Sequence, residues 1–414
     1  MNTYKLNKYD LVFCWILIYI TGKILWDKIP IVFEGLFFII IGVTALNYLY
    51  THFGTKKVNR IIAMAIIFSA YVTANALFQD SIKEIMRCIY EYVFYMFPMF
   101  SMIKYRRKIN LLKCFQLVSK WGTIISILSW YEYFTHHYLL KDLSAYGHIL
   151  NVGDYGFRAA VFTRSYLSHG VVLGVFSLIS IYIWHEKRQI PWLINGVFAY
   201  VTIITTGSRG PLVAFGTALV MFFFLDAFFI TKSLRKERRF LLFAIIIFFS
   251  LVCIILLPID SADSFATYYI YRIQSIFNWK GDAGNAGRTL IWNLAINNWF
   301  LSSPIFGIGP SKTGSWGMFT LGVTESGVLR RLCEFGMVGF ILFYTYLLFV
   351  VKGSLKCIKW LSENEKKEMV LWLTIFIGIF INDLTVQTTE EIMVSFWWWL
   401  ALGGITVLKL KSKI

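Results

Sequence analysis

Residues 166–184 read YLSHGVVLGVFSLISIYIW and contain no Asp, Glu, Lys or Arg. This run fits a helix that crosses the hydrocarbon layer of a membrane, which needs roughly 20 mostly apolar residues. Runs of this kind recur along all 414 residues, and the chain is 57% hydrophobic but only 15% charged. This balance excludes a soluble globular domain with an ordinary surface.

The apolar runs predict an all-α polytopic membrane protein with about 12 transmembrane helices. They fall at residues 11–26, 31–51, 61–78, 88–103, 115–135, 166–184, 190–206, 210–231, 240–258, 328–351, 368–386 and 390–408. The connections leave no room for a separate soluble domain, so we expect residues 1–414 to form a single integral membrane domain. The first run lacks a small-residue cleavage site, which indicates a retained span rather than a signal peptide.

Basic residues gather in short clusters in alternate connections, for example at residues 104–113, 232–239 and 352–367. Such clusters mark the cytoplasmic side of a membrane protein, so we expect both termini in the cytoplasm. The formal net charge of +17 therefore arises from clusters that set the membrane topology, and it does not indicate a nucleic-acid partner. The six cysteines form no C-x-x-C pair, so we expect free thiols and no metal site.

Two connections on the opposite, outward-facing side are long, at residues 136–165 and 259–327. Loops of this length usually carry function. In the larger loop, asparagines lie on one face of a predicted helix and apolar residues recur at helical spacing on the other. The apolar residues are Trp292, Ala295, Ile296, Trp299 and Phe300. We expect an amphipathic helix on the outer membrane surface from residue 288 to residue 301.

The first candidate site is the tight turn TTGSRGP at residues 205–211, between two apolar runs. Arg209 is expected at the outer membrane edge, and glycines on both sides of the turn let the backbone approach a ligand closely. The alternative is an interfacial anchor whose guanidinium reaches the lipid headgroups, but anchoring arginines are rarer on the outer side. We therefore favour a functional role for Arg209.

The second candidate is NAGR at residues 285–288, where Arg288 is expected to open the surface helix. A cation is unfavourable at a helix N-terminus, so Arg288 is not there to stabilise the helix. Together with free backbone N–H groups it suits a phosphate or pyrophosphate. A solvated loop arginine is the alternative interpretation. The glycine-rich turn IFGIGP follows the helix at residues 305–310.

The third candidate is TESGVLRR at residues 324–331, followed by EFG at residues 334–336. Glu325 stands at the outer mouth of a span, and Arg330 and Arg331 lie about a turn deeper. Ionisable groups at this depth are costly unless they are paired or face a polar cavity. They either bind substrate or form a structural ion-pair cluster of Glu325 with Arg330 or Arg331.

These three segments, in this order, resemble the O-antigen ligase and Wzy polymerase superfamily of bacterial membrane glycosyltransferases. The family's S-R-G turn matches residues 208–210, its G-R-x-x-x-W and P-x-x-G-x-G elements match residues 287–292 and 304–309, and its closing element matches Leu329 and the E-x-G at residues 334–336. The resemblance implies a GT-C-like fold in a bacterial cytoplasmic (inner) membrane. It implies oligosaccharides linked to undecaprenyl pyrophosphate as donor and acceptor, membrane lipids and a chain-length regulator protein as partners, and no cofactor.

The resemblance also implies roles for the site residues. Arg209 and Arg288 are expected to be catalytic residues that bind the pyrophosphate and stabilise the charge that builds on it as the glycosidic bond breaks. The family's ligases have a catalytic His where this chain has Glu325, so Glu325 is the candidate base in a metal-independent, inverting transfer. This departure disfavours the ligase branch and favours a polymerase that makes an O-antigen or capsular polysaccharide.

Further basic residues are candidates for substrate binding. Besides Arg209 and Arg288 they are Arg330, Arg331, Arg158, Arg164 and His169, the last three of which border the smaller outer loop. Acidic residues in or near the spans are expected to be helix-end or paired structural groups: Glu34, Glu91, Glu132, Asp226 and Asp383.

Two alternatives stay open at this point. A ligase that moves a finished glycan to another acceptor differs in sequence only by Glu325 in place of His. A transporter or flippase for a lipid-linked sugar would also present basic cavities, but it should show charges deep in the membrane and two related halves. Here the basic residues are expected at the outer edge of an asymmetric chain, which argues against a transporter. A purely structural scaffold is also disfavoured, because it does not explain arginines on the outer side.

Overall fold

The computed structural model describes residues 7–21, 42–43, 60–78, 82–139, 157–163, 165–230, 283–310, 312–313 and 324–411. These residues form helices and short helical turns, with no strand among them. The α-helices are α1 (Lys8–Thr21), α4 (Arg60–Ala76), α5 (Ile82–Cys88), α6 (Phe97–Tyr105), α7 (Leu111–Thr135), α8 (Tyr166–Lys187), α9 (Ile190–Thr202), α10 (Arg209–Phe229), α13 (Ala283–Ser302), α14 (Gly327–Cys357), α15 (Glu363–Thr385) and α16 (Ile392–Lys411). The predicted all-α membrane fold is confirmed.

Among the described residues, six helices are long and apolar enough to cross a membrane: α7, α8, α10, α14 with the turn that follows it, α15 and α16. Two shorter apolar helices lie at Ile62–Ala76 and Ile190–Thr206. The predicted runs 31–51 and 240–258 lie outside the described residues, apart from Gly42 and Val43. The total of about 12 spans therefore stays a prediction.

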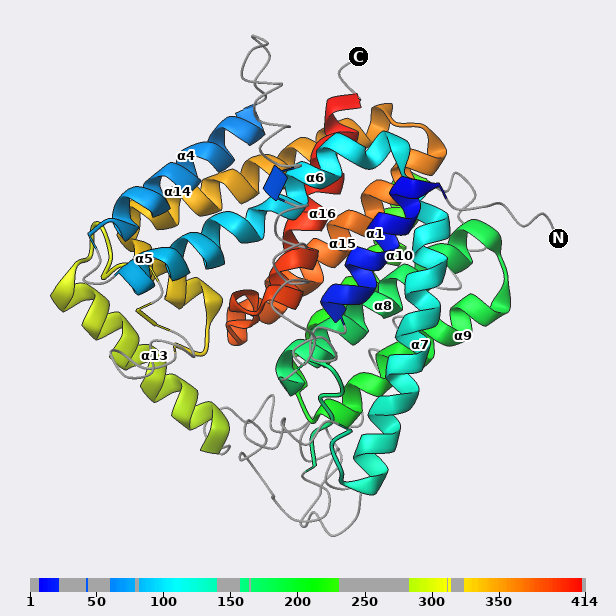
Figure 1. The fold of residues 1–414 in the computed structure, drawn as a ribbon, viewed down its shortest axis with the longest axis horizontal. Coiled ribbons are helices and arrows are strands. Elements are labelled where there is room, and N and C mark those ends of the chain that lie inside the picture. Colours follow the sequence, from blue (N-terminus) through cyan, green and yellow to red (C-terminus); the bar gives the residue numbers. More distant parts are fainter. Residues whose placement is uncertain are drawn as a thin grey trace.

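Helices α8 and α16 form the centre of the bundle and are buried along almost their whole length. Helix α8 packs against α7, α9, α10 and α15, and α16 packs against α6, α14 and α15 (Figure 1). Large side chains such as Phe215, Trp372 and Trp397 fill these interfaces and are fully buried. Because lipid tails are as apolar as these side chains, close packing rather than the hydrophobic effect holds such helices together.

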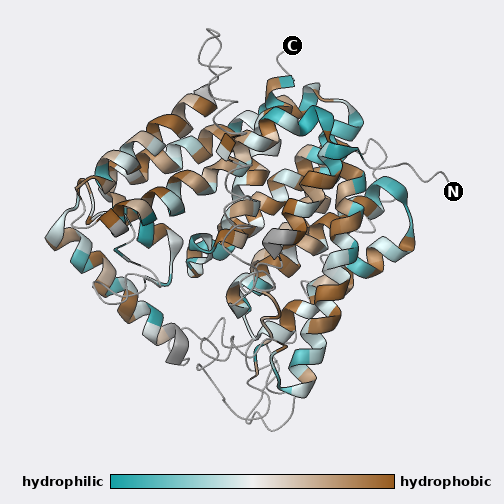
Figure 2. Ribbon diagram, viewed as in Figure 1, coloured by the Kyte–Doolittle hydropathy of each residue, from teal (hydrophilic) through white to brown (hydrophobic). Residues whose placement is uncertain are grey.

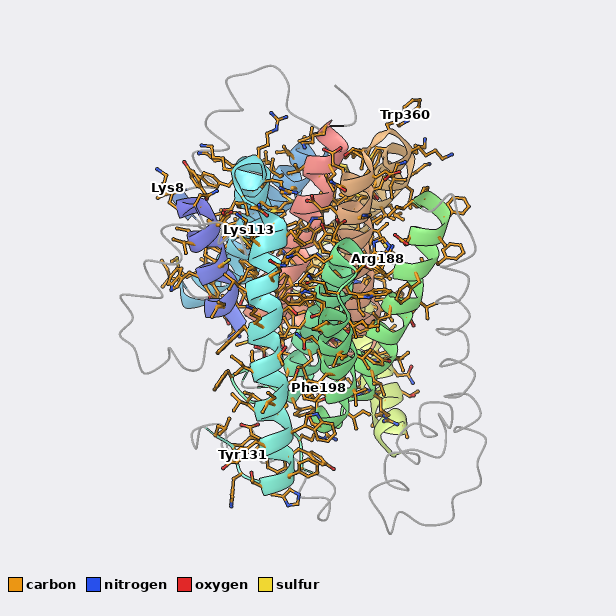
Figure 3. All side chains as sticks on the ribbon, turned by 90° about the vertical axis from the view of Figure 1, so that its right-hand side faces the viewer. Lys8, Lys113, Tyr131, Arg188, Phe198 and Trp360 are labelled. Atoms are coloured by element: carbon orange, nitrogen blue, oxygen red, sulfur yellow. The ribbon has the colours of Figure 1, made fainter. Side chains whose placement is uncertain are left out.

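The two ends of the bundle differ. Figure 3 shows Lys8, Lys113 and Trp360 at one end and Tyr131 at the other. We call the first the basic end, which holds the start of α1, the turn between α6 and α7, the turn between α14 and α15, and the C-terminal end of α16. Figure 2 shows hydrophilic residues gathered there, whereas the helices are hydrophobic along much of their length. Assignment of the basic end to the cytoplasm stays a prediction.

We call the opposite end the motif end. It holds the C-terminal ends of α7 and α15 and the starts of α8, α10, α14 and α16. Side-chain contacts between these ends, described below, bring the sequence motifs together. Residues 140–156 of the smaller loop and 259–282 of the larger one lie outside the described residues.

The predicted span 88–103 is not one regular helix. Helix α5 continues into a π-helical turn at Ile89–Val93 and a 3-10 turn at Phe94–Met96 before α6 begins. Pro98, near the start of α6, lacks the N–H that would bond the carbonyl four residues earlier, so a regular α-helix cannot run through this point. The π turn carries the buried Glu91, and such turns are frequent at functional sites.

A helix is present where the larger loop was expected to form one, but it begins at Ala283 rather than at Arg288. One face of this helix, α13, packs on α14, where the Cys333 thiol donates to the carbonyl of Ala295 at 3.4 Å. The exposed part of its surface includes apolar residues: Leu290, Leu294, Ile296, Phe300 and Leu301. Helix α13 lies at the edge of the bundle (Figure 1), where this exposed face suits contact with lipid.

Candidate functional site

The S-R-G turn joins the short helical turn Ile203–Thr206 to α10 at the motif end. Gly207 ends the first turn with a φ of 60°, and its N–H donates to the carbonyl of Ile204 at 2.9 Å. Ser208 is extended, and the half-buried Arg209 begins α10. A residue with a Cβ is strained at positive φ, so Gly207 allows the chain to reverse here. The tight turn expected at Arg209 is therefore present.

Arg158, from the smaller loop, lies against this turn. A Cβ at Gly207 would come within 3.3 Å of Cγ of Arg158, and the Arg158 guanidinium lies 4.4 Å from the centroid of the Tyr166 ring. The hydroxyl of Tyr138 donates to the Arg158 carbonyl at 3.1 Å. Burial raises the pKa of Tyr138, so this phenol stays protonated as a donor. Arg164 lies outside the described residues.

Helix α14 is broken at Gly336, which has a φ of 61° and a ψ of −170°. The break leaves backbone N–H and C=O groups near Gly336 without partners inside the helix. The P-x-x-G-x-G loop at residues 304–309 supplies hydrogen-bond partners for these groups. Four hydrogen bonds result: Ile308 N to Cys333 O at 2.9 Å, Gly309 N to Glu334 O at 3.0 Å, Met337 N to Pro304 O at 2.9 Å and Val338 N to Ile305 O at 3.1 Å. The loop after α13 is thereby fixed to α14.

Two glycines make this pairing possible. Gly307 and Gly336 both have positive φ, of 80° and 61°. A Cβ at Gly307 would lie 2.3 Å from the carbonyl oxygen of Glu334, and a Cβ at Gly336 would lie 2.3 Å from that of Ile305. No side chain fits at either position, so these two motif glycines bring the backbones of the loop and the helix into contact.

Arg288 and Glu325 form an ion pair, with Nε of Arg288 3.0 Å from Oε2 of Glu325. Their side chains are 27% and 40% exposed, so a ligand can reach both. The pair joins the second motif to the third. Arg288 lies inside α13 rather than at its start, so the expected contribution of free helix-start N–H groups beside Arg288 is wrong. An anion at this position would be held by the Arg288 guanidinium and not by helix-start N–H groups.

Glu325 adopts a left-handed conformation, with a φ of 48°. This conformation costs a residue with a Cβ about 1–2 kcal/mol, and such strain is concentrated at functional sites. The flanking residues hold it in place. The Thr324 hydroxyl donates to Oε1 of Gln387 at 2.7 Å, and the Ser326 hydroxyl caps the start of α14. Glu325 is therefore presented on a short, braced turn.

Arg330 is buried among carboxylates. Its three nitrogens lie close to three of them: Nη2 is 2.6 Å from Glu91, Nε is 3.0 Å from Glu334 and Nη1 is 3.0 Å from Glu390. Glu334 also accepts hydrogen bonds from Tyr92 and from the Thr313 hydroxyl. Arg330 thus ties α14 to the π turn and to the start of α16. All its nitrogens are engaged, so the structure does not support the expected substrate-binding role.

Arg331 is also buried and paired. Its Nη1 lies 2.6 Å from Oδ2 of Asp383, and its Nη2 lies 2.7 Å from the Thr389 hydroxyl. The guanidinium lies 4.7 Å from the centroid of the Phe343 ring. Here too the structure gives no support to substrate binding. The ion pair considered between Glu325 and one of these arginines is not the observed one, because Glu325 pairs with Arg288.

Two residues at the end of α15 connect the S-R-G turn to the start of α14. A Cβ at Gly210 would lie 3.0 Å from Oδ1 of Asn382, and a Cβ at Gly327 would lie 2.2 Å from Oδ2 of Asp383. Neighbouring residues of α15 thus contact the first motif and the third. Since the second motif pairs with the third through Arg288, all three motifs are linked at the motif end.

His169 is fully buried between α7 and α8, with Nε2 2.6 Å from the Ser129 hydroxyl. A bound sugar does not reach this ring, so the expected substrate-binding role of His169 is not supported. Glu132 is buried nearby and accepts hydrogen bonds from the N–H groups of Leu139, Ala160 and Val161, at 3.0, 3.1 and 2.9 Å. It is a structural group, as expected.

The sequence interpretation missed the residues that the other helices bring to this end. They are Tyr92, Asn382, Thr389 and Glu390. One sequence feature could have indicated them: carboxylates lie in or at the ends of the apolar runs, and such groups need buried partners. Glu91 and Asp383 belonged to that set, and their pairing with Arg330 and Arg331 matches the structural role expected of them.

Comparison with known proteins concerns the same region. Residues 194–344 match the family model described as O-Antigen ligase. No curated protein matches the chain significantly. The matched residues include the S-R-G turn, α13 and the first part of α14, so they contain all three motifs. The match supports membrane glycosyl transfer of the ligase or polymerase type. Residues 194–344 of this chain are therefore similar to the O-antigen ligase family.

Proposed function

We propose that this protein is a polymerase that joins lipid-pyrophosphate-linked oligosaccharide repeat units into a cell-surface polysaccharide at the outer face of a bacterial cytoplasmic membrane. The reaction is a single displacement. The acceptor hydroxyl attacks the anomeric carbon of the donor, the bond to the pyrophosphate oxygen breaks, and the anomeric configuration inverts. The observation that carries this proposal is the exposed ion pair between Arg288 and Glu325.

The arginines are proposed to stabilise the leaving group. Negative charge builds on the pyrophosphate as the glycosidic bond breaks, and donors already held in place stabilise it without reorganisation. The planar guanidinium forks of Arg209 and Arg288 suit a pyrophosphate, which accepts two hydrogen bonds from each. Contacts of α15 and of Glu325 link the segments that carry these two arginines, which supports a shared site open to the outer leaflet.

Donor binding is proposed to release the base. The Glu325 carboxylate and the donor pyrophosphate compete for the same guanidinium, and the pyrophosphate carries the greater charge. When it takes Arg288, the ion pair opens and leaves an ionised carboxylate that accepts the proton of the attacking hydroxyl. The brace around Glu325, formed by Thr324 and Ser326, supports this role because it keeps the freed carboxylate near the reacting groups.

The buried arginines are proposed to position the site rather than to touch substrate. Arg330 and Arg331 lie in the first turns of α14, which begins two residues after Glu325, and each is fixed by carboxylates from other segments. A helix start held in this way limits the movement of Glu325 when Arg288 changes partner. The exposed apolar face of α13 supports a place for this helix at the membrane interface, beside a lipid-linked donor.

The test is incubation of the purified, reconstituted protein with a defined undecaprenyl-pyrophosphate oligosaccharide. A polymerase produces a ladder of glycans that differ by one repeat unit. Transfer of a preformed glycan to a different acceptor, with no ladder, would instead establish a ligase. Movement of the intact donor across the bilayer with no new glycosidic bond would contradict both and favour a transporter. The same protein carrying Lys187→Gln, an exposed side chain at the end of α8, serves as a matched control for loss of a surface charge.

A further inference from the structure

A cavity lies among α1, α6 and α16, away from the motif end. Lys8, at the basic end, lines it. It is a groove of about 260 Å³. Its apolar lining comes from three helices that are far apart in sequence: Val12, Phe13, Ile16, Met102, Phe396 and Leu400. None of these residues takes part in the site at the motif end. An apolar groove of this lining suits an acyl chain.

Three lysines lie at or beside the groove, around two tyrosines that also line it. Nζ of Lys108 lies 4.9 Å from the centroid of the Tyr9 ring, and Nζ of Lys8 lies 5.4 Å from it. Nζ of Lys104 lies 5.6 Å from the centroid of the Tyr105 ring. The two rings stack, with centroids 5.7 Å apart. This cluster places positive charge next to an apolar groove, which is the pattern that recognises anionic headgroups.

The cluster is held in place by hydrogen bonds between α1 and the turn before α7. The side-chain amide of Asn7 donates to the carbonyl of Lys108 at 3.0 Å, and the N–H of Asn110 donates to Oδ1 of Asp10 at 2.6 Å. Asp10 is only 1% exposed. Its carboxylate is turned inward onto the backbone, so it does not compete with a ligand for the lysines.

A buried hydroxyl also lines the groove. The Ser101 hydroxyl oxygen is buried and has no hydrogen-bond partner within the described part of the chain. Ser101 precedes Lys104 and Tyr105 by three and four residues on α6, so all three lie on one face of this helix. Buried polar groups in proteins are almost always hydrogen-bonded, and an acceptor on a ligand in the groove meets this need.

We propose that this groove binds an anionic glycerophospholipid. Its phosphate lies against Lys8, Lys104 and Lys108, one acyl chain follows the apolar lining, and the Ser101 hydroxyl donates to an ester carbonyl. A polyprenyl tail would fill the apolar part but would give the lysines no anionic partner and Ser101 no acceptor. The site is separate from the proposed donor site and stays valid whether or not the chain is a polymerase.

Native mass spectrometry of the purified full-length protein tests the proposal, with phosphatidylglycerol and phosphatidylcholine of identical acyl chains as probes. The protein should retain phosphatidylglycerol in preference to phosphatidylcholine. The double variant Lys8→Gln/Lys108→Gln should lose this preference by roughly tenfold or more, because each lysine near an anionic headgroup contributes to its binding. The control Lys187→Gln/Lys359→Gln removes the same charge from two exposed lysines elsewhere and should keep the preference.

A groove-filling variant, Ser101→Phe, distinguishes a site from general charge attraction. It should retain less of both lipids while its thermal stability shows that it is folded. Millimolar inorganic phosphate should not displace phosphatidylglycerol. Equal retention of the two lipids by the unaltered protein, loss of preference in the control variant, or displacement by phosphate alone would each overturn the proposal.

Discussion

Arg288 and Glu325 are 37 residues apart in the chain, yet Nε of the arginine lies 3.0 Å from Oε2 of the glutamate. The pair connects α13 to the turn that begins α14, and both side chains are partly exposed. Each group satisfies the other while no ligand is bound. A pyrophosphate offers Arg288 a more strongly charged partner, so the pair couples donor binding to the release of a carboxylate.

Arg209→Lys is expected to lose donor binding and glycan extension. An ammonium keeps the charge but cannot reproduce the planar fork of a guanidinium, and loss of one donor to the developing charge typically lowers the rate about 10²–10³-fold. Extension and donor binding are measured on the same preparation. Arg188→Lys, in the turn between α8 and α9, is the matched control and should remain active. Full activity of Arg209→Lys would reduce Arg209 to a membrane anchor.

Gly307→Ala and Gly336→Ala are each expected to destabilise the protein by at least roughly 1–3 kcal/mol, because the backbone has positive φ and the added Cβ would meet a carbonyl oxygen. Thermal unfolding in detergent measures the change. Gly287→Ala is the control, since within the described ranges no atom outside the helix's own backbone lies within 4 Å of a Cβ at that position. There the change should be neutral or stabilising by about 0.5–1 kcal/mol, as for other helical glycines. Equal effects at all three positions would contradict the pairing of the loop with α14.

Asp383→Ala is expected to destabilise the protein by about 3–5 kcal/mol, because it leaves the buried Arg331 without its carboxylate. The comparison is Lys411→Ala, which breaks the more exposed pair with Glu365 and should change stability by less than about 1 kcal/mol. The unfolding temperatures of the two variants, each compared with that of the unaltered protein, measure these losses of stability. Similar small losses in both would show that Arg331 does not depend on its buried partner.

The orientation of the bundle predicts which surface cysteines react. Asn298→Cys on α13 should be labelled by a membrane-impermeant maleimide in cells whose outer barrier has been removed. Lys359→Cys, at the basic end, should be labelled only after the membrane is breached. Both positions are exposed, and the native cysteines among the described residues are buried, so the parent chain gives the background. The reverse pattern would invert the proposed topology.

The membrane-spanning helices were predictable because membrane thickness sets the length of an apolar run. The start of α13 was not predictable from the sequence. Its first residues, Ala283–Gly287, show none of the apolar spacing found later in the helix, so the pattern marks the helix only from about Arg288 onward. The break at Gly336 also escaped prediction, because its cause is a contact with Gly307 that local sequence does not contain.

The site was predictable in its motifs and not in its pairings. Helical spacing suggested that Glu325 would meet Arg330 or Arg331, but the left-handed backbone of Glu325 takes it off the helix and toward Arg288. One partner of Arg330 is Glu91, which lies 239 residues away. A single sequence shows that such a buried arginine needs a carboxylate, but it does not show which one.

Glycan extension by Glu325→Gln, measured together with donor binding in the same reconstituted preparation, shows whether Glu325 is the base. Gln keeps the shape of the side chain but cannot accept the proton. It also competes less strongly with a pyrophosphate for Arg288. If Glu325 is the base, this variant should bind donor at least as tightly as the unaltered protein and extend glycans more slowly by on the order of 10²–10⁴-fold. Near-normal extension by Glu325→Gln would contradict this role and remove Glu325 from the mechanism.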